Sequence, residues 1–425
     1  MTAATVRIIA VGDELLEGRT SDTNSTRMQR ALGVYAVQVR DIAVVADRAE
    51  DIAAALDRTG AGDIVLVCGG LGATRDDLTR EAIAAWAGVP LVYREDVAAQ
   101  LAERRRLRGL PPLAAGDKQA AVPAGCEPIA NPVGSAPGLI GVLRDRRVAV
   151  MPGVPAELEA LLPGIVEGLR RLGALAEPRP TRLWRTAQMT EAAVARLCEP
   201  VRARHPGLRW SWWIGEWGVD VRIGAEPRDR AALDAAAADV DAALGDTVYA
   251  RERSELPLVV QDLMLARRST LAVAESCTGG LLAAAITGQA GSSGYYLGGV
   301  VSYADAAKIE LLGVDPGELG RHGAVCGPVA EQMARGARAR LGADWALATT
   351  GIAGPGGGSQ EKPVGTTWIA LAGPDGARSG GFRFAGDRDR NRRLAVAAAL
   401  DVLRRELTGD RVFDAERLSW RISPR

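Results

Sequence analysis

Lysine is the rarest charged residue of this 425-residue chain, and its few positions single out candidates for chemistry. Of the 52 cationic side chains only Lys118, Lys308 and Lys362 are lysines. An arginine keeps its charge, whereas a lysine amine can lose its proton and act as a base. Histidine occurs only twice, so histidine dyads and multi-histidine metal sites are nearly excluded. If the protein uses a general base, we therefore expect one of the three lysines to be that base.

A candidate nucleophile lies in the segment 275–280 (Glu-Ser-Cys-Thr-Gly-Gly), which follows an apolar run. A serine at a strand-to-helix turn lies beside backbone N–H groups and a helix dipole, and both can stabilise an oxyanion. Ser276 needs a base, and Lys308 lies in the first turn of a predicted helix, where the dipole disfavours a cation. A capping serine and a solvated lysine are the alternative interpretation. Cys277 is a competing nucleophile.

Two glycine-rich segments near the start, 12–18 and 69–77, could bind a phosphate through backbone N–H groups. Carboxylates beside them could hold a divalent cation that bridges phosphates. The alternative is that the glycines shape tight turns and that Asp76 or Asp77 caps the helix ending near Gly88. The candidate nucleotide-binding residues are Gly12, Glu14, Asp22, Asn24, Gly69, Gly70, Gly72, Thr74 and Lys118, and the candidate metal ligands are Asp76 and Asp77.

The elements that must position these loops alternate strand and helix along residues 1–172. We predict strands at 6–11, 37–45 and 63–68 and helices at 21–32 and 48–58. This rhythm implies a parallel sheet with helices on both faces. Ligands of such sheets bind beyond the carboxyl ends of the strands, which is where both glycine-rich segments fall.

Residues 181–248 predict a small α+β domain rich in tryptophan. Its second strand is expected over 208–223, with Leu208, Trp210 and Trp212 on one face and Trp213 on the other. We interpret these side chains as core and packing residues, the alternative being a platform for stacking bases. The tryptophan-rich strands also make us expect a homodimer.

Residues 257–408 predict a second α/β unit, and residues 409–425 a tail. The expected strands are 270–274, one ending at 303, 345–349 and 366–371, and the expected helices are 258–268, one from about 277, one from about 305, 328–341 and 388–407. The fold class is therefore α/β, with two α/β units joined by a small α+β middle domain.

Composition excludes several classes of function. Acidic and basic residues are equal at 52 each, so we expect no direct nucleic-acid partner and no membrane partner. The uncharged stretch 276–304 is interrupted by glycines and polar residues, and the N-terminus lacks a signal-peptide pattern. Five cysteines without a close pair indicate neither disulfides nor a zinc cluster. We expect a cytoplasmic protein.

The first domain resembles the molybdopterin-binding-type domain that begins proteins of the competence/damage-inducible CinA family. The resemblance rests on the glycine-rich segments above and on 118–120, 131–138 and 151–155. It implies metal-dependent cleavage of the pyrophosphate in ADP-ribose and related dinucleotides, with a divalent metal ion as cofactor. The sequence departs from the family pattern at Ala73, where proline is usual, and at 116–117, where an asparagine-arginine pair is common.

The last domain resembles the C-terminal CinA domain. The matching segments are 274–280, 300–303, Lys308, 322–325, 350–355, 357–365 and 386–388. The resemblance implies a nicotinamide-nucleotide amidase without a cofactor, which releases ammonia from nicotinamide mononucleotide through catalytic Ser276, Tyr303 and Lys308. We expect neutral Lys308 to activate Ser276, with Tyr303 relaying or orienting the proton. Thr278, Gly279, Gly280, Thr350, Gly351, Arg388 and Arg392 are the candidate substrate-binding residues, the two arginines lying one helical turn apart.

The function predicted on this basis is amide hydrolysis of a small pyridine nucleotide, with dinucleotide pyrophosphatase activity in the first domain. We expect backbone N–H groups near 278–280 to hold the oxyanion. Cys326 stands where the family commonly has serine, a change expected to affect helix capping. The alternatives are a catalytically silent protein that binds a pterin or a nucleotide, and a nucleic-acid-binding accessory protein of competence or DNA damage.

Overall fold

The computed structural model describes residues 4–109, 111, 117–251, 254–410 and 412–413, which fall into two compact units divided between Arg179 and Pro180. Each unit is described by itself. Of the predicted tail, only residues 409–410 and 412–413 lie within the described part of the chain. Among the described residues no helix has the length and apolar character needed to cross a membrane.

The first unit is built on a six-stranded sheet. Its strands are β1 (Ala4–Val11), β2 (Val37–Val45), β3 (Ile64–Cys68), β6 (Cys126–Ile129), β7 (Gly138–Leu143) and β8 (Arg146–Met151). They lie in the order β2-β1-β3-β8-β7-β6, and the first four are parallel. The expectation of a wholly parallel sheet is wrong at one edge, because β7 and β8 form a hairpin. The hairpin turn, Arg144-Asp145, has positive φ at both residues, the geometry that suits a two-residue connection.

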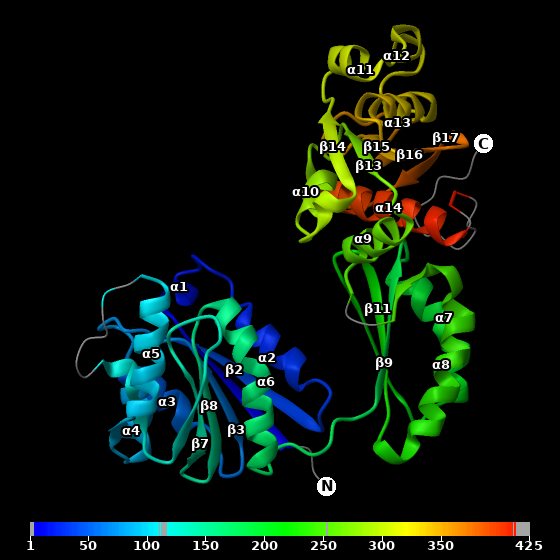
Figure 1. Cartoon of the computed structure of the whole chain (residues 1–425). Coiled ribbons are helices and arrows are strands. Elements are labelled where there is room, and N and C mark those ends of the chain that lie inside the picture. The colour runs from blue at the N-terminus through cyan, green and yellow to red at the C-terminus, as the bar shows by residue number, and fades with distance from the viewer. Residues whose placement is uncertain (1–3, 110, 112–116, 252–253, 411, 414–425) are drawn as a thin grey trace. The chain divides into compact units, whose positions relative to one another are not determined.

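Helices cover both faces of this sheet, as predicted (Figure 1). The helices are α1 (Asp13–Leu16), α2 (Asn24–Leu32), α3 (Ala49–Asp57), α4 (Thr79–Ala87), α5 (Glu95–Leu107) and α6 (Pro155–Arg171), and a small separate sheet pairs β4 (Leu91–Tyr93) with β5 (Ala121–Pro123). Helices α3 and α4 bury Ile52 and Ile83 against one face, while α2 and α6 bury Met28 and Ile165 against the other. Apolar residues at helical spacing thus close a core on each side.

The second unit begins with a four-stranded sheet. Its elements are β9 (Thr181–Ala187), α7 (Glu191–Arg204), β10 (Arg209–Ile214), β11 (Gly218–Gly224), α8 (Arg230–Leu244) and β12 (Val248–Ala250). The single strand predicted over 208–223 is wrong, because a turn in which the Gly215 N–H donates to the Gly218 carbonyl divides it into the β10–β11 hairpin. Trp210 and Trp212 pack against the core of this sheet, while Trp213 points away, as the alternation predicted.

A five-stranded sheet follows in the same unit. Its strands are β13 (Leu271–Glu275), β14 (Tyr296–Val301), β15 (Trp345–Gly351), β16 (Thr366–Gly373) and β17 (Gly376–Arg383). The order is β14-β13-β15-β16-β17, with the first three strands parallel and the last two antiparallel. The helices are α9 (Leu256–Arg267), α10 (Leu281–Thr287), α11 (Asp305–Leu312), α12 (Pro316–His322), α13 (Gly327–Leu341) and α14 (Arg388–Thr408), and the short 3₁₀ helices of the whole chain are Lys118–Ala120, Pro227–Asp229, Gly245–Thr247 and Ser292–Gly294.

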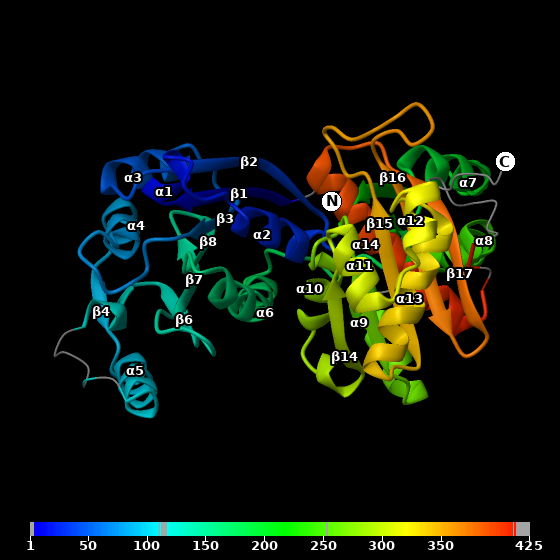
Figure 2. The ribbon, with the colours of Figure 1, turned by 90° about the horizontal axis from the view of Figure 1, so that it is seen from above.

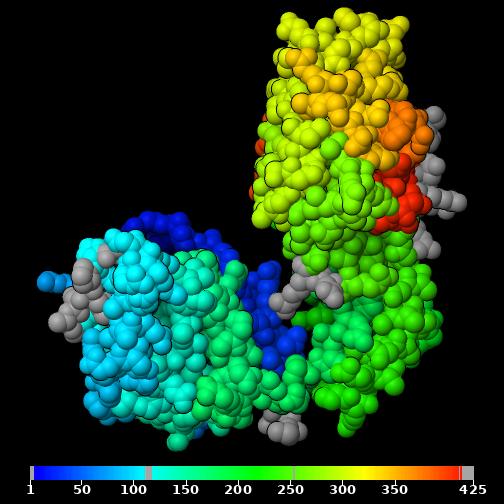
Figure 3. Space-filling model, in the orientation of Figure 1, coloured from blue at the N-terminus to red at the C-terminus, as the bar shows by residue number. Residues whose placement is uncertain are grey.

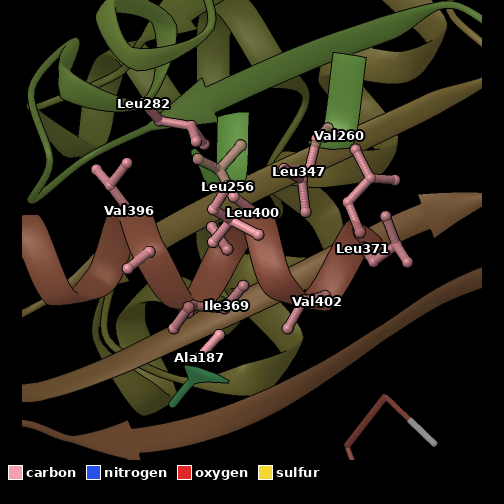
Figure 4. Packing of buried hydrophobic residues seen from close by; sticks show 14 of the residues in the cluster. Ala187, Leu256, Val260, Leu282, Leu347, Ile369, Leu371, Val396, Leu400 and Val402 are labelled. Carbon is pink, nitrogen blue, oxygen red and sulfur yellow. The ribbon is translucent and has the colours of Figure 1, made fainter. Parts of the chain in front are cut away.

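The two faces of this sheet differ in the size of their side chains. Alanines of β13, β15 and β16 pack against α11, α12 and α13, while larger residues face α9, α10 and α14. Figure 2 shows α11 to α13 together, and Figure 4 shows the apolar side chains around α14. Small residues on one face let α13 approach the sheet closely. The side of the sheet that a residue faces therefore identifies the helices it can reach.

The four-stranded and five-stranded sheets share a core. The apolar cluster around α14 includes three residues of the middle segment, Ala187, Trp217 and Tyr249. The middle and C-terminal segments are continuous in the space-filling view (Figure 3), and Figure 4 shows Ala187 among the residues of this cluster. The fully buried Asp401 of α14 accepts hydrogen bonds from Arg404 and Arg405 and from Gln188 at the end of β9. One helix therefore joins both sheets of the second unit.

Candidate active site

The carboxyl ends of β14, β13 and β15 meet at one edge of the five-stranded sheet. Glu275 pairs with Val301 on one side and Thr349 on the other. The ladder continues one residue further, because the Ser302 N–H donates to the Glu275 carbonyl at 2.9 Å and the Ser276 N–H to the Thr349 carbonyl at 2.9 Å. Ser276 therefore lies between the ends of two neighbouring strands, where α/β sheets bind their ligands.

Glu275 shapes the turn that presents Ser276. Its carboxylate is fully buried and accepts N–H groups of Gly280, Leu282 and Ala283 at 2.8–3.1 Å. Gly279 and Gly280 adopt φ of 59° and 96°, values that only glycine takes readily. The helix predicted from about residue 277 consequently starts at Leu281. Glu275 is a functional residue that spacing alone did not single out.

The same turn decides which backbone donors are free. The Gly279 N–H donates to the Ser276 carbonyl and the Gly280 N–H to Glu275, so neither is available to a substrate. The N–H groups of Cys277 and Thr278 are directed at the Cys277 sulfur, a weak acceptor, and no stronger acceptor is recorded for them among the described residues. Of the expected oxyanion donors near 278–280, the amides of Gly279 and Gly280 are therefore excluded by their hydrogen bonds.

Lys308 is buried, with 1% of its side chain exposed, so the interpretation as a solvated surface lysine is wrong. It lies in the first turn of α11, and its Nζ donates to the Tyr303 carbonyl at 3.1 Å and lies 3.4 Å from the exposed carboxylate of Asp305. No hydrogen bond among the described residues joins this Nζ to the Ser276 hydroxyl.

Tyr303 lies at the same edge but faces the other way. Its side chain is 60% exposed, and its hydroxyl accepts a hydrogen bond from Arg388 Nη2 at 3.1 Å. Arg388 Nη1 donates to the Gly354 carbonyl, and Arg392 Nη2 donates to the Thr278 carbonyl, both at 2.8 Å. The start of α14 thus brings two cations beside the tyrosine and the serine turn.

Two threonines of the predicted binding set are structural neighbours of this turn. The buried Thr278 hydroxyl shares a hydrogen bond of 2.7 Å with Thr349, and the Thr350 hydroxyl donates to the Ala324 carbonyl. Gly351 lies so close to Thr367 that a Cβ atom would fall 2.6 Å from its hydroxyl. These residues fix the edge of the sheet rather than present free polar groups.

Cys277 is next to Ser276 but is poorly suited to attack. Burial raises the pKa of its thiol to about 12, and the nearby Glu275 carboxylate raises it further. The thiolate is the reactive form of cysteine. Cys277 is therefore a protonated, buried thiol at neutral pH. Cys326, which stands where the family commonly has serine, is the N-cap residue of α13, and its side chain makes no capping hydrogen bond.

Asn391 is a residue that the sequence argument missed. It is buried in α14, and its Nδ2 donates to the Ala353 carbonyl at 3.0 Å and to the Gly386 carbonyl at 2.9 Å. It therefore ties the loop after β15 to the start of α14. Asparagine is as rare here as lysine, with three residues in the chain, and that scarcity was the available signal.

In the first unit, the predicted loops also meet at the carboxyl edge of the parallel strands. The Gly12 N–H donates to the Val45 carbonyl and the Gly69 N–H to the Met151 carbonyl, while Asn24 Nδ2 donates to the Gly153 carbonyl at 2.7 Å. Glu14 packs on Gly12, and Gly70 lies against Thr79. Two other candidates form hydrogen bonds within these loops. Asp22 accepts the Ser25 N–H, and Lys118 Nζ donates to the Asp77 carbonyl.

The acidic residues of this loop do not form a preformed metal site. Asp77 accepts hydrogen bonds from the Gly72 N–H and from the N–H and hydroxyl of Thr74, so its oxygens are already used. It does not cap α4, whose first residue is Thr79, which corrects the capping expectation. Within the described ranges, no group of three or more His, Cys, Asp or Glu side chains is arranged to hold a metal ion. The residues present therefore do not fit a resident divalent cation.

A neighbouring carboxyl shows how crowded this edge is with negative charge. Burial raises the pKa of Asp47, and the Asp13 and Glu14 carboxylates raise it further.

A cavity of about 660 Å³ in the same unit lies elsewhere, between α5 and α6, and is lined by part of the 131–138 segment. None of the candidate nucleotide-binding residues lines it.

Comparison with known proteins gives the class first. A model described as a probable molybdopterin binding domain matches residues 7–171, and one described as the CinA C-terminal domain matches 253–407. The chain is thus an α/β protein that combines these two domains. A CinA-like protein of Frankia casuarinae is 43% identical over 95% of this chain and 96% of its own length. One of Anaeromyxobacter dehalogenans is 40% identical over 94% and 98%, respectively. The chain belongs to the CinA family.

Among solved structures, one titled competence damage-inducible protein A from Klebsiella pneumoniae is 39% identical over 36% of this chain and 95% of that chain, with a TM-score of 0.35.

Proposed function

We propose that the C-terminal domain hydrolyses the carboxamide of nicotinamide mononucleotide to nicotinic acid mononucleotide and ammonia. One observation carries the proposal: a buried lysine and a turn that presents a serine lie at the same carboxyl edge of one sheet, and the amides of residues 277 and 278 have only the weakly accepting Cys277 sulfur as a partner. A serine, a base and oxyanion donors are the parts that acyl transfer needs.

The proposed reaction proceeds through an acyl-enzyme. Neutral Lys308 accepts the proton of Ser276 as Oγ bonds to the carboxamide carbon, and the N–H groups of Cys277 and Thr278 hold the oxyanion. The C–N bond breaks as the departing nitrogen takes that proton and leaves as ammonia. Water then attacks the ester, and its proton returns to Ser276 through Lys308.

Substrate recognition is proposed to come from the start of α14. Arg388 and Arg392 lie one turn apart and could pair with the phosphate of the mononucleotide, for which arginine is well suited. The Tyr303 hydroxyl, which Arg388 already contacts, lies beside them. The N-terminal amides of α10 are unavailable for this purpose, because Glu275 occupies them.

The test is ammonia release from nicotinamide mononucleotide by the whole protein and by Lys308→Arg. Arginine keeps the charge but cannot serve as a base, so we expect turnover to fall by at least about 100-fold in the variant. Lys118→Arg, in the other unit, is the matched control and should keep the parent rate of ammonia release. Equal rates for the parent and Lys308→Arg would refute the assignment of the base.

For the first unit we propose nucleotide binding at the carboxyl edge of its parallel strands. The supporting observation is Asn24, whose Oδ1 is buried and has no hydrogen-bond partner among the described residues. Cleavage of ADP-ribose is the reaction to test, with and without added Mg²⁺. Binding of ADP-ribose without cleavage would instead favour the silent binding protein as the role of this unit.

A further inference from the structure

Ser302 is a buried serine next to the candidate nucleophile, and the reaction proposed above does not use it. Its side chain is fully buried, and its Oγ has no hydrogen-bond partner among the described residues. A buried hydroxyl without a hydrogen-bond partner destabilises the folded state. Such a group in a native fold calls for a functional explanation.

Alternation along the strands places Ser302 on the face of the sheet that carries Lys308. Val300 packs in the cluster with α11 and α13, whereas Val301 lies near Gly280 on the α10 side. Side chains alternate between faces, so Ser302 returns to the α11 side and Tyr303 to the α14 side. The contact of the Tyr303 hydroxyl with Arg388 of α14 agrees with this assignment.

Ser276 continues the same face. Ala272 and Ala274 of β13 pack against the α13 side, and the next residue of that parity is Ser276. Ser302 lies on the adjacent strand, where its N–H bonds to the carbonyl that directly precedes Ser276. Lys308 Nζ is held by the carbonyl that directly follows Ser302. Ser302 thus lies between the nucleophile and the amine along the edge of the sheet.

We propose that the Ser302 hydroxyl relays the proton between Ser276 and Lys308. During attack, Ser276 Oγ–H passes its proton to Ser302 Oγ as Ser302 passes its own proton to the neutral amine. The ammonium form of Lys308 returns a proton through Ser302 to the leaving nitrogen, so the relay is unchanged after the step. This inference rests on the proposed function, and it assigns Tyr303 to the substrate side of the site.

The experiment measures both turnover and covalent labelling of Ser276 by a fluorophosphonate, which needs an activated serine but no particular substrate. In Ser302→Ala we expect labelling and kcat to fall about 100-fold, with KM within about twofold of the parent. Ser302→Thr keeps a hydroxyl and should restore most of both. Ser379→Ala is the matched control. It removes a hydroxyl from β17, which faces α13 on the same side of the sheet as Ser302, and its labelling and turnover should match those of the parent.

The outcomes separate this inference from the proposed function. Parent-like labelling and turnover in Ser302→Ala, with an unchanged melting temperature, would overturn the relay and leave the amidase standing. If labelling of Ser276 depends on Ser302 but no ammonia is released from nicotinamide mononucleotide, the relay is supported and nicotinamide mononucleotide is refuted as the substrate. A parent protein that is not labelled at Ser276 would overturn the relay.

Discussion

Glu275 holds three backbone donors of the serine turn. Its carboxylate accepts the N–H groups of Gly280, Leu282 and Ala283, so the proposed oxyanion would rely on the amides of residues 277 and 278. Hydrogen bonds to a charged acceptor contribute about 1.5–3 kcal/mol each. We expect Glu275→Gln to lower the free energy of unfolding by about 2 kcal/mol and to slow turnover, as measured by urea titration and ammonia release. Glu310→Gln, an exposed change on α11, should alter neither.

The neighbouring pair Ser276 and Cys277 gives a second prediction at this scale. Because burial raises the pKa of Cys277 to about 12, the thiol stays protonated across the range in which the protein is folded and active. We expect Ser276→Ala to abolish ammonia release and Cys277→Ala to retain most of it. Loss of turnover in the cysteine variant alone would reverse the assignment.

At the scale of elements, α14 connects the site to the middle sheet. Its first turns carry Arg388 and Arg392, and about two and a half turns after Arg392 the Asp401 carboxylate accepts hydrogen bonds from Arg404 and Arg405. Burial alone would raise the pKa of Asp401, but the two arginines hold it below its ordinary value. The direction of the shift shows that the ion pairs outweigh the desolvation.

This network predicts a pH dependence of stability. Because the folded pKa of Asp401 lies below its unfolded value, the stabilisation is complete above the unfolded pKa and is lost as pH falls through the folded pKa. Removing one partner of a buried pair costs about 3–5 kcal/mol. We expect Asp401→Asn to lower stability by about 3 kcal/mol at pH 7, and by less in acid, as measured by urea unfolding.

A surface pair on the same helix provides the control for this prediction. Asp389 pairs with Arg393 in solvent, where an ion pair contributes little to stability. Asp389→Asn should therefore barely change stability at any pH. An equal loss in both variants would show that charge on α14, rather than the buried network, sets the stability.

Sequence periodicity predicted the regular elements well and the turns poorly. The strand at 37–45 matches β2 in full, and the last helix differs from α14 by one residue. Three features depend on single turns with positive φ or with local hydrogen bonds: the start of α10, the turn that separates β10 from β11, and the β7–β8 hairpin. A pattern of apolar residues does not encode such turns. The scarcity of lysine singled out Lys308 as a candidate base but did not predict its burial, and Glu275 looked like any acidic residue.

At the scale of the whole molecule, the middle and C-terminal segments form one unit. Ala187, Trp217 and Tyr249 pack on α14, and Arg405 pairs with Asp246. We expect a fragment 254–425 to melt at least about 5 °C below a fragment 180–425, because that shared core and ion pair are lost. Calorimetry of the two fragments would measure this, and equal melting temperatures would show that the two sheets are energetically independent.

All three lysines of the chain donate a hydrogen bond to a main-chain carbonyl. Lys118 donates to Asp77, Lys308 to Tyr303 and Lys362 to His322, at 2.5–3.1 Å. Lys308 is buried, so apart from the α-amino group, reagents that acylate amines reach only Lys118 and Lys362, each on a loop that borders a candidate site. Attachment of this protein to a sensor chip through amines would tether it by its binding edges. Footprinting with an acylating agent, by contrast, would report ligand occupancy with almost no background from the rest of the surface.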